Sequence, residues 1–295
     1  MSEPTDHHFV PVFYLKQWAG ADNQVWEYSK VRGKLVSKRI GPRGTGFERH
    51  LYRSDALSAD KAQFLEAKFL KKTDQEASLA LQALFGGPLL PWAHQNHRQA
   101  WARFVYQLLI RHPEPFAEVR AASEQNWLQA DGLTQQEYER RRTRDMPETW
   151  DEWAQTEPGL KDEMIISLLT VSMDNDLVCD RIKRLDWEVF DVGKAKRLLL
   201  TSDWPVENAL GEANPFVAMP ISPRHIFVGA QDPNSLASLR RRPATELVRT
   251  MNLFTVSRAL RYVWTYDLSA TRFIEKHMSI VKRSAPYFPS MIQRL

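Results

Sequence analysis

The sequence is short of residues and patterns that identify several common classes of protein. Its 295 residues include a single cysteine, Cys179, which excludes an internal disulfide and cysteine-based zinc sites. Cys179 falls within a helical pattern, and this favours a packing role over a nucleophilic one. No apolar run is long enough to cross a bilayer, and the first residues lack a basic segment followed by an apolar one. We therefore expect a cytoplasmic protein without a membrane span or a signal peptide.

The motifs of several enzyme classes are also missing. The chain has no GxxxxGK[ST], GxGxxG, HExxH, CxxC or GxSxG pattern. Nucleotide-driven enzymes, Rossmann enzymes, zincins and ordinary α/β-hydrolases therefore lose their usual sequence support. Metal-dependent nucleases often have weak signatures, so the absence says less about them.

The residues that are present indicate a globular, mildly basic protein. Hydrophobic residues make up 43% of the chain, which is enough for a substantial core. The formal net charge of +4 is compatible with DNA or RNA as a partner without requiring either. The ten tryptophans need no ligand to explain them, because aromatic side chains bury large areas in ordinary cores.

Hydrophobic periodicity divides the chain into three parts. Residues 1–58 are rich in strand patterns: a short extended piece and a helical turn over 6–18, then a hairpin of 25–29 and 34–40 around Arg32-Gly33. Residues 59–186 are mostly helical, and helices are predicted over 60–85, 94–111 and 161–185. Asn175 lies on the apolar stripe of the last of these helices.

The third part, residues 187–295, mixes strands and helices. Its predicted strands are 187–192, 198–201, 216–219, 226–228 and 262–266, and its predicted helices are 244–260 and 270–278. The second and third runs end in polar turns, at TSDWP and at Pro220. We predict an α+β fold in one domain, 1–295, with the helical middle packed against a mixed or antiparallel sheet of N-terminal and C-terminal strands.

Fragments across the chain resemble a known bacterial family. They are HHFVPVFYLKQWA, VWEYSK, GFERHLYR, LLLTSDWPV, MPISPR and the helix of Asn252 with the Arg261-Tyr262-Val263 that follows it. Together they look like the family catalogued as domain of unknown function 4238. The resemblance brings no established reaction, and it implies only that these segments form one unit. The polar stretch 117–161 shows no match.

Two sets of residues suggest chemistry near chain turns. His7 and His8 follow Asp6, and neutral imidazoles bind transition metals or serve as general bases. Adjacent strand residues point to opposite faces, so a pair of structural histidines is the alternative. Asp203 is either a metal ligand or base, or a turn cap that Asn could replace with little loss.

Inward-facing polar residues form a second set of candidates. Glu66, Gln107, Arg111 and Asn252 fall on the apolar faces of predicted helices, and Arg224 lies in the MPISPR turn. Buried charges need a partner, a metal or a ligand. We therefore treat Glu66 as a catalytic candidate and the other four as candidates for binding substrate. A Glu66–Arg111 ion pair that only joins two helices is the alternative.

These patterns lead to two functional hypotheses. The first is a metal-assisted phosphodiester hydrolase of a bacterial defence or toxin type, with His7 or His8 and Asp203 near the scissile group, and Arg111 on phosphate. In this hypothesis His8 and Asp203 are the candidate ligands of a divalent metal. The second is a non-catalytic module that binds nucleic acid or protein. The cluster Arg140, Arg141, Arg142 and Arg144 is either a phosphate-binding patch or a solvated helix face.

Overall fold

A computed structural model describes residues 6–49, 51, 70–86, 95–126, 135–156, 159 and 173–280. The N-terminal part has the predicted short strand, β1 (Asp6–His8), and the predicted helical turn, α1 (Val12–Leu15) with η1 (Lys16–Trp18). Strand β1 pairs with β4 (Phe47–Arg49), which follows the short helix η2 (Pro42–Gly44).

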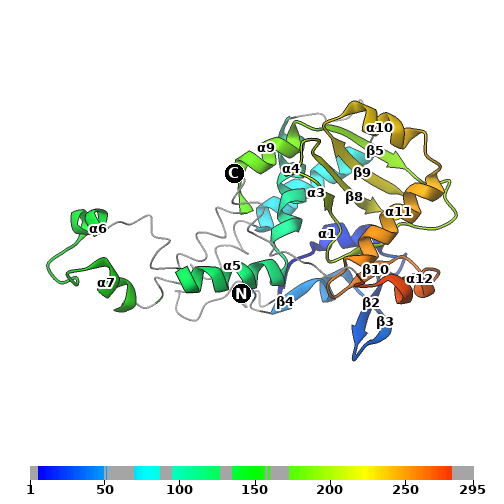
Figure 1. Ribbon diagram of the computed structural model, residues 1–295. Helices are drawn as coiled ribbons and strands as arrows, with labels where there is room; N and C mark the ends of the chain where they lie inside the picture. Colours follow the sequence, from blue (N-terminus) through cyan, green and yellow to red (C-terminus); the bar gives the residue numbers. More distant parts are fainter. Residues whose placement is uncertain are drawn as a thin grey trace.

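The first large sheet joins the two ends of the chain. The predicted hairpin forms β2 (Val25–Val31) and β3 (Lys34–Ile40), and the strand order is β3-β2-β10-β6. Strands β10 (Val263–Thr265) and β6 (Thr201–Ser202) come from the C-terminal part, and all of the pairings are antiparallel. The predicted α+β class, with one sheet built from both ends of the chain, is confirmed (Figure 1).

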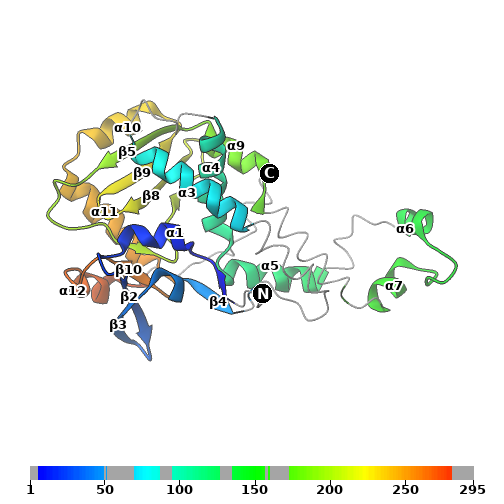
Figure 2. The same cartoon turned by 180° about the vertical axis from the view of Figure 1, so that it is seen from behind.

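The second sheet lies entirely within the C-terminal part and has helices on both faces. Its antiparallel order is β5-β9-β8-β7. The bounds are β5 (Asp186–Asp191), β7 (Glu207–Asn208), β8 (Phe216–Ser222) and β9 (His225–Ala230). One face packs with α4, where Trp101 meets Phe227 at 5.6 Å between ring centroids. The other face packs against α10 and α11 (Figures 1 and 2).

The remaining elements are helices. Their bounds are α3 (Lys71–Phe85), α4 (Gln95–Ile110), α5 (Pro113–Asn126), α6 (Gln135–Arg141), α7 (Trp150–Thr156), α9 (Asp176–Lys183), α10 (Pro233–Arg240), α11 (Ala244–Ser257) and α12 (Thr271–His277). Tyr138 and Trp150 join α6 and α7 in a small cluster of their own. Within the described residues, no helix is long and apolar enough to cross a membrane.

Cys179 has the packing environment that its position in a helix predicts. It is fully buried in the main core, on α9. Burial raises the pKa of its thiol to about 12, so the sulfur stays protonated and poorly nucleophilic at neutral pH.

Three predicted element boundaries are wrong. The helix predicted over 161–185 is interrupted, because Asn175 has extended backbone and its side chain accepts from the Val178 N–H as the N-cap of α9. The strand predicted over 198–201 is present only at Thr201 and Ser202. The break predicted at Pro220 does not occur, since β8 continues to Ser222.

Pro220 is tolerated inside β8 because of its place in the sheet. Strand β7 pairs with Val217 and Ala218 and stops short of Pro220, so the missing N–H is not needed on that side. A register shift follows between Pro220 and Ser222. The Pro220 carbonyl accepts a hydrogen bond from the Tyr14 hydroxyl at 2.7 Å, which ties the strand to α1.

Asn252 on α11 ties this helix to the chain that leads into β6. Its Oδ1 accepts from the Leu200 N–H, and its Nδ2 donates to the Leu198 carbonyl, each at 2.8 Å. The Asn252 side chain therefore bonds the backbone of Leu198 and Leu200, which lie just before β6 and outside the sheet.

Replacing Asn252 with Ala should lower the free energy of unfolding by about 2 kcal/mol or more, since each buried backbone group left without a partner costs ~1–3 kcal/mol. Urea unfolding of wild type and variant measures the difference. Arg249→Ala, at an exposed position on the same helix, is the control and should change stability by no more than about 0.5 kcal/mol. Equal stability of Asn252→Ala and Arg249→Ala would contradict this role.

Candidate functional site

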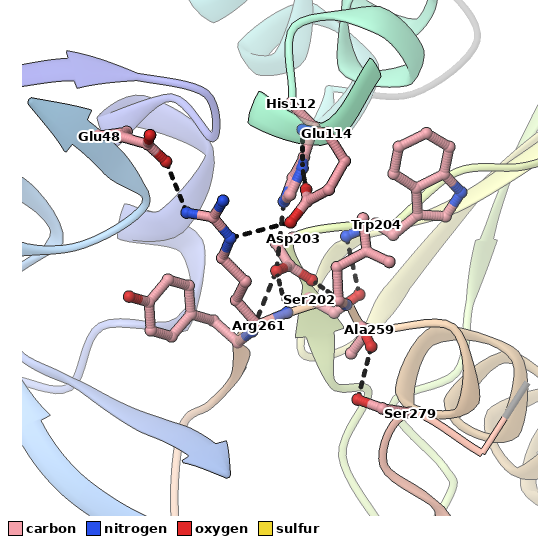
Figure 3. Close-up of polar contacts among 11 residues, drawn as sticks. Glu48, His112, Glu114, Ser202, Asp203, Trp204, Ala259, Arg261 and Ser279 are labelled. Carbon is pink, nitrogen blue, oxygen red and sulfur yellow. Dashed lines mark hydrogen bonds and ion pairs between the residues drawn. The ribbon is translucent and has the colours of Figure 1, made fainter. Parts of the chain in front are cut away.

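Asp203 lies directly after β6 and is buried. Its Oδ1 accepts from the Leu260 N–H at 2.9 Å, and its Oδ2 accepts from the Arg261 N–H at 2.6 Å and the Tyr262 N–H at 3.0 Å (Figure 3). These donors are consecutive in the loop between α11 and β10. The carboxylate thus caps a loop that is remote in sequence, and its two oxygens both take part.

A chain of charged groups extends from Asp203 to the surface. His112, at the corner between α4 and α5, places Nε2 3.4 Å from Asp203 Oδ2, and its Nδ1 pairs with the Glu114 carboxylate. Arg261 binds Glu114 through Nε at 3.0 Å and Glu48 through Nη1 at 2.6 Å. We name Glu48, His112, Glu114, Asp203 and Arg261 the His112 network (Figure 3).

The charges of the network stabilise one another. Burial by itself lowers the pKa of His112, but hydrogen bonds from the ring to Asp203 and Glu114, and their negative charges, outweigh burial and raise that pKa. Burial raises the pKa of Glu114, and contacts with His112 and Arg261 reverse this effect and bring the pKa to about 2. The two carboxylates therefore favour the protonated form of His112, which lies between them.

Exposure increases along the network. The His112 side chain is 1% exposed, whereas those of Glu114 and Arg261 are 36% and 38% exposed. The network therefore runs from a fully buried imidazole to side chains that are partly exposed to solvent. The network can hold a proton on His112. Both ring nitrogens face carboxylates, so neither is directed at an open site where it could act as a base.

The N-terminal histidines lie beside this network. His7 is buried and stands opposite Glu48 in the β1–β4 pair, and the ring of Phe9 contacts that of His112 with centroids 4.7 Å apart. Burial lowers the pKa of His8, and its Nε2 is buried without a hydrogen-bond partner among the described residues. The N-terminal strand and the TSDWP turn therefore meet at the same place in the fold.

Arg111 and Gln107 face the core, as predicted, and contact protein groups. Arg111 donates to both carboxylate oxygens of Asp74 on α3, at 2.9 and 3.3 Å, and to the His8 carbonyl at 2.8 Å. Gln107 Nε2 lies 3.5 Å from the Met173 carbonyl. Asp74 therefore provides the ion pair that the sequence suggested for Glu66, a residue that lies outside the described part of the chain.

Arg224 also binds backbone carbonyls. Its Nη1 donates to Ala195 at 2.7 Å and is 3.4 Å from the carbonyl oxygen of Gly193. Arg224 and Asn252 thus both support the segment between β5 and β6, and neither lies in the His112 network. Their predicted contact with a substrate stays a prediction.

The predicted metal ligands are His8 and Asp203, and the contacts around Asp203 leave little room for a metal ion. Within the described residues, no group of three or more His, Cys, Asp or Glu side chains could hold a metal ion. Three N–H donors and His112 surround the carboxylate of Asp203, so a metal would have to displace contacts that hold the loop. A role of His8 and Asp203 as metal ligands stays a prediction.

Sequence reasoning missed four members of the network: Glu48, His112, Glu114 and Arg261. His112-Pro113 looked only like the end of a helix, and Glu114 like part of a charged stretch. Glu48 and Arg261 stood in family-like fragments, and that was the available signal. Their pairing depends on contacts between residues 147 and 213 positions apart, which local patterns do not report.

Replacing Asp203 with Asn should destabilise the fold by about 2 kcal/mol or more, because an amide has one acceptor oxygen and would turn its NH₂ toward backbone donors. This corrects the expectation that Asn serves nearly as well. Thermal unfolding of Asp203→Asn measures the loss. Asp191→Asn is the matched control, since exposed Asp191 accepts one backbone N–H through Oδ1. Equal melting of the two variants would refute the multiple-acceptor role.

His112 should make stability depend on pH above about 6.5, the ordinary pKa of histidine. The folded protein retains a proton that the unfolded chain releases, so the free energy of unfolding should fall as pH rises from about 6.5 through the raised pKa. Urea unfolding between about pH 6 and about pH 9 of wild type and His112→Gln measures this fall. Parallel curves for the two proteins would show that His112 does not carry the effect.

Comparison with protein families gives a match over most of the chain. The model of the family described as "Protein of unknown function (DUF4238)" matches residues 6–267. No curated protein and no solved structure matches the chain. The matched range includes every member of the His112 network and both sheets. The chain therefore belongs to the DUF4238 family of proteins of unknown function.

Proposed function

We propose that this protein is a non-catalytic module that binds nucleic acid through its β2–β3 hairpin. The observation that carries the proposal is the charge of this hairpin. Residues 25–40 contain one acidic side chain, Glu27, and five cationic ones: Lys30, Arg32, Lys34, Lys38 and Arg39. Such a concentration of positive charge attracts a phosphate backbone.

The shape of the hairpin supports this proposal. Arg32 and Gly33, with φ angles of 51° and 78°, form a two-residue turn, and the hairpin projects from the body of the protein (Figures 1 and 2). Val31 and Val36, 53% and 43% exposed, give it an apolar surface among the cations. A two-stranded ribbon fits the major groove of DNA, which is about 12 Å wide.

The base of the hairpin is fixed to the rest of the protein. The Tyr28 hydroxyl lies 2.6 Å from the Thr271 hydroxyl, and Lys30 donates to the Met278 carbonyl at 2.6 Å. Lys38 pairs with Glu27 at 3.0 Å. Within the described residues, Arg32 and Lys34 at the tip form no ion pair, so their charges are available to phosphate.

A metal-assisted phosphodiester hydrolase, of a defence or toxin type, has less support. Its candidate residues Asp203, Arg111 and Asn252 bind protein groups, and this favours a supporting role for each. The arginines of α6 also have less support as the phosphate site. Arg140 and Arg141 are exposed and pair with Glu137, as expected of a solvated helix face.

The test is the double substitution Arg32→Gln and Lys34→Gln. Affinity for a duplex DNA or RNA oligonucleotide should fall, and the slope of log K against log salt should become less steep by about 2, because two phosphate contacts are lost at ~0.9 each. Fluorescence anisotropy at several salt concentrations measures both quantities. Incubation with Mg²⁺ or Mn²⁺ in the same buffers tests for cleavage.

The matched control is Arg140→Gln with Arg141→Gln, which removes the same charge from another exposed surface. This variant should bind with the wild-type affinity and salt slope. If the control loses binding and the hairpin variant retains it, α6 is the contact surface. If wild type binds neither nucleic acid, the proposal fails, and cleavage by wild type would restore the hydrolase hypothesis.

A further inference from the structure

An apolar groove lies between the second sheet and the helices α10 and α11. Its volume is about 690 Å³, within the ~300–1,000 Å³ that is usual for small-molecule sites. Described residues on its walls include Phe190, Ala218, Val228, Leu247, Met251 and Phe254. None of the described residues that line the groove belongs to the β2–β3 hairpin, so a ligand site here is independent of nucleic-acid binding.

Small side chains on the sheet create the space. In the antiparallel register, Glu188, Val228, Ala218 and Glu207 stand opposite one another across four strands, so they share one face of the sheet. At its centre this row has only an alanine and a valine. Soluble proteins seldom leave a large apolar groove open to solvent unless it binds a partner or a ligand, so this groove is a candidate ligand site.

One carboxyl group stands at the edge of the groove without a hydrogen bond. Glu207 Oε2 is buried and has no hydrogen-bond partner within the described residues, although Arg258 Nη1 forms an ion pair with it at 3.3 Å. Arg258 is itself held over the ring of Phe254, 4.2 Å from the centroid. Burial raises the pKa of Glu207 to about 7, and Arg258 opposes that rise.

The geometry points to a binding site for a small, mostly aromatic or aliphatic molecule that carries one hydroxyl or amide N–H donor. The apolar walls would bury the body of the molecule, and the donor would bind the carboxylate of Glu207, a side chain that lines the groove and is 25% exposed. The apolar surroundings remove part of the hydration of this carboxylate, and a ligand donor would supply a hydrogen bond in place of water. A neutral donor suits the site better than an ammonium group, because Arg258 already supplies a positive charge.

The probes are 2-naphthol and 2-methoxynaphthalene, which share an aromatic body and differ in the donor. We measure their binding to the full-length protein by calorimetry or ligand-detected NMR at about pH 8, where Glu207 is ionised. Wild type should bind 2-naphthol at or below about 1 mM and prefer it by about fivefold, as one net hydrogen bond predicts. Absence of 2-naphthol binding at about 1 mM would overturn the proposal.

Two variants test the two parts of the site. Ala218→Leu fills the groove and should abolish binding of both probes, whereas Ala121→Leu, on the exposed surface of α5, should change neither. Glu207→Leu should retain binding and lose the preference for 2-naphthol. Circular dichroism checks that each variant is folded. Unchanged binding to folded Ala218→Leu, or an unchanged preference in Glu207→Leu, would each contradict the assignment.

Discussion

The buried carboxylate of Asp203 is the constraint on which the centre of the molecule depends. An ionised carboxylate in the core is costly unless hydrogen bonds and opposite charge compensate for the lost water. Three consecutive backbone N–H groups and His112 supply this compensation. The same contacts join the end of β6 to the loop before β10, so the carboxylate fixes the geometry of two neighbouring strands in the first sheet.

Several of the family-like fragments meet at this constraint. GFERHLYR contains Glu48, LLLTSDWPV contains Asp203, and Arg261 begins the Arg-Tyr-Val fragment. The ion pairs and hydrogen bonds described above bring these fragments together around His112. Phe9, from the first fragment, packs against the same imidazole. These four fragments therefore meet at the His112 network, whereas VWEYSK and MPISPR lie outside it.

The fold was predictable where the signal is local. The hairpin around Arg32-Gly33, the apolar faces of α3 and α4 and the strands near residues 187 and 226 all follow from short-range periodicity. The break at Asn175 was missed because an amide on an apolar stripe also suits an N-cap. The site was less predictable. Turn chemistry gave a cap as one of the possible roles of Asp203, but its backbone donors lie 57 to 59 residues further along the chain.

Inward-facing polar residues in this protein have structural contacts that account for their positions. Segments that pair incompletely in a sheet leave backbone groups that need partners, and a buried side chain can supply them. Asn252 and Arg224 bind such groups, and Arg111 binds the His8 carbonyl in addition to Asp74. Each therefore has a structural reason for its position. The residues proposed to bind ligands have fewer structural contacts: the cations at the exposed hairpin tip and the Glu207 carboxylate in the apolar groove contribute little to folding. Function in this chain is better sought among the polar groups that the fold does not use.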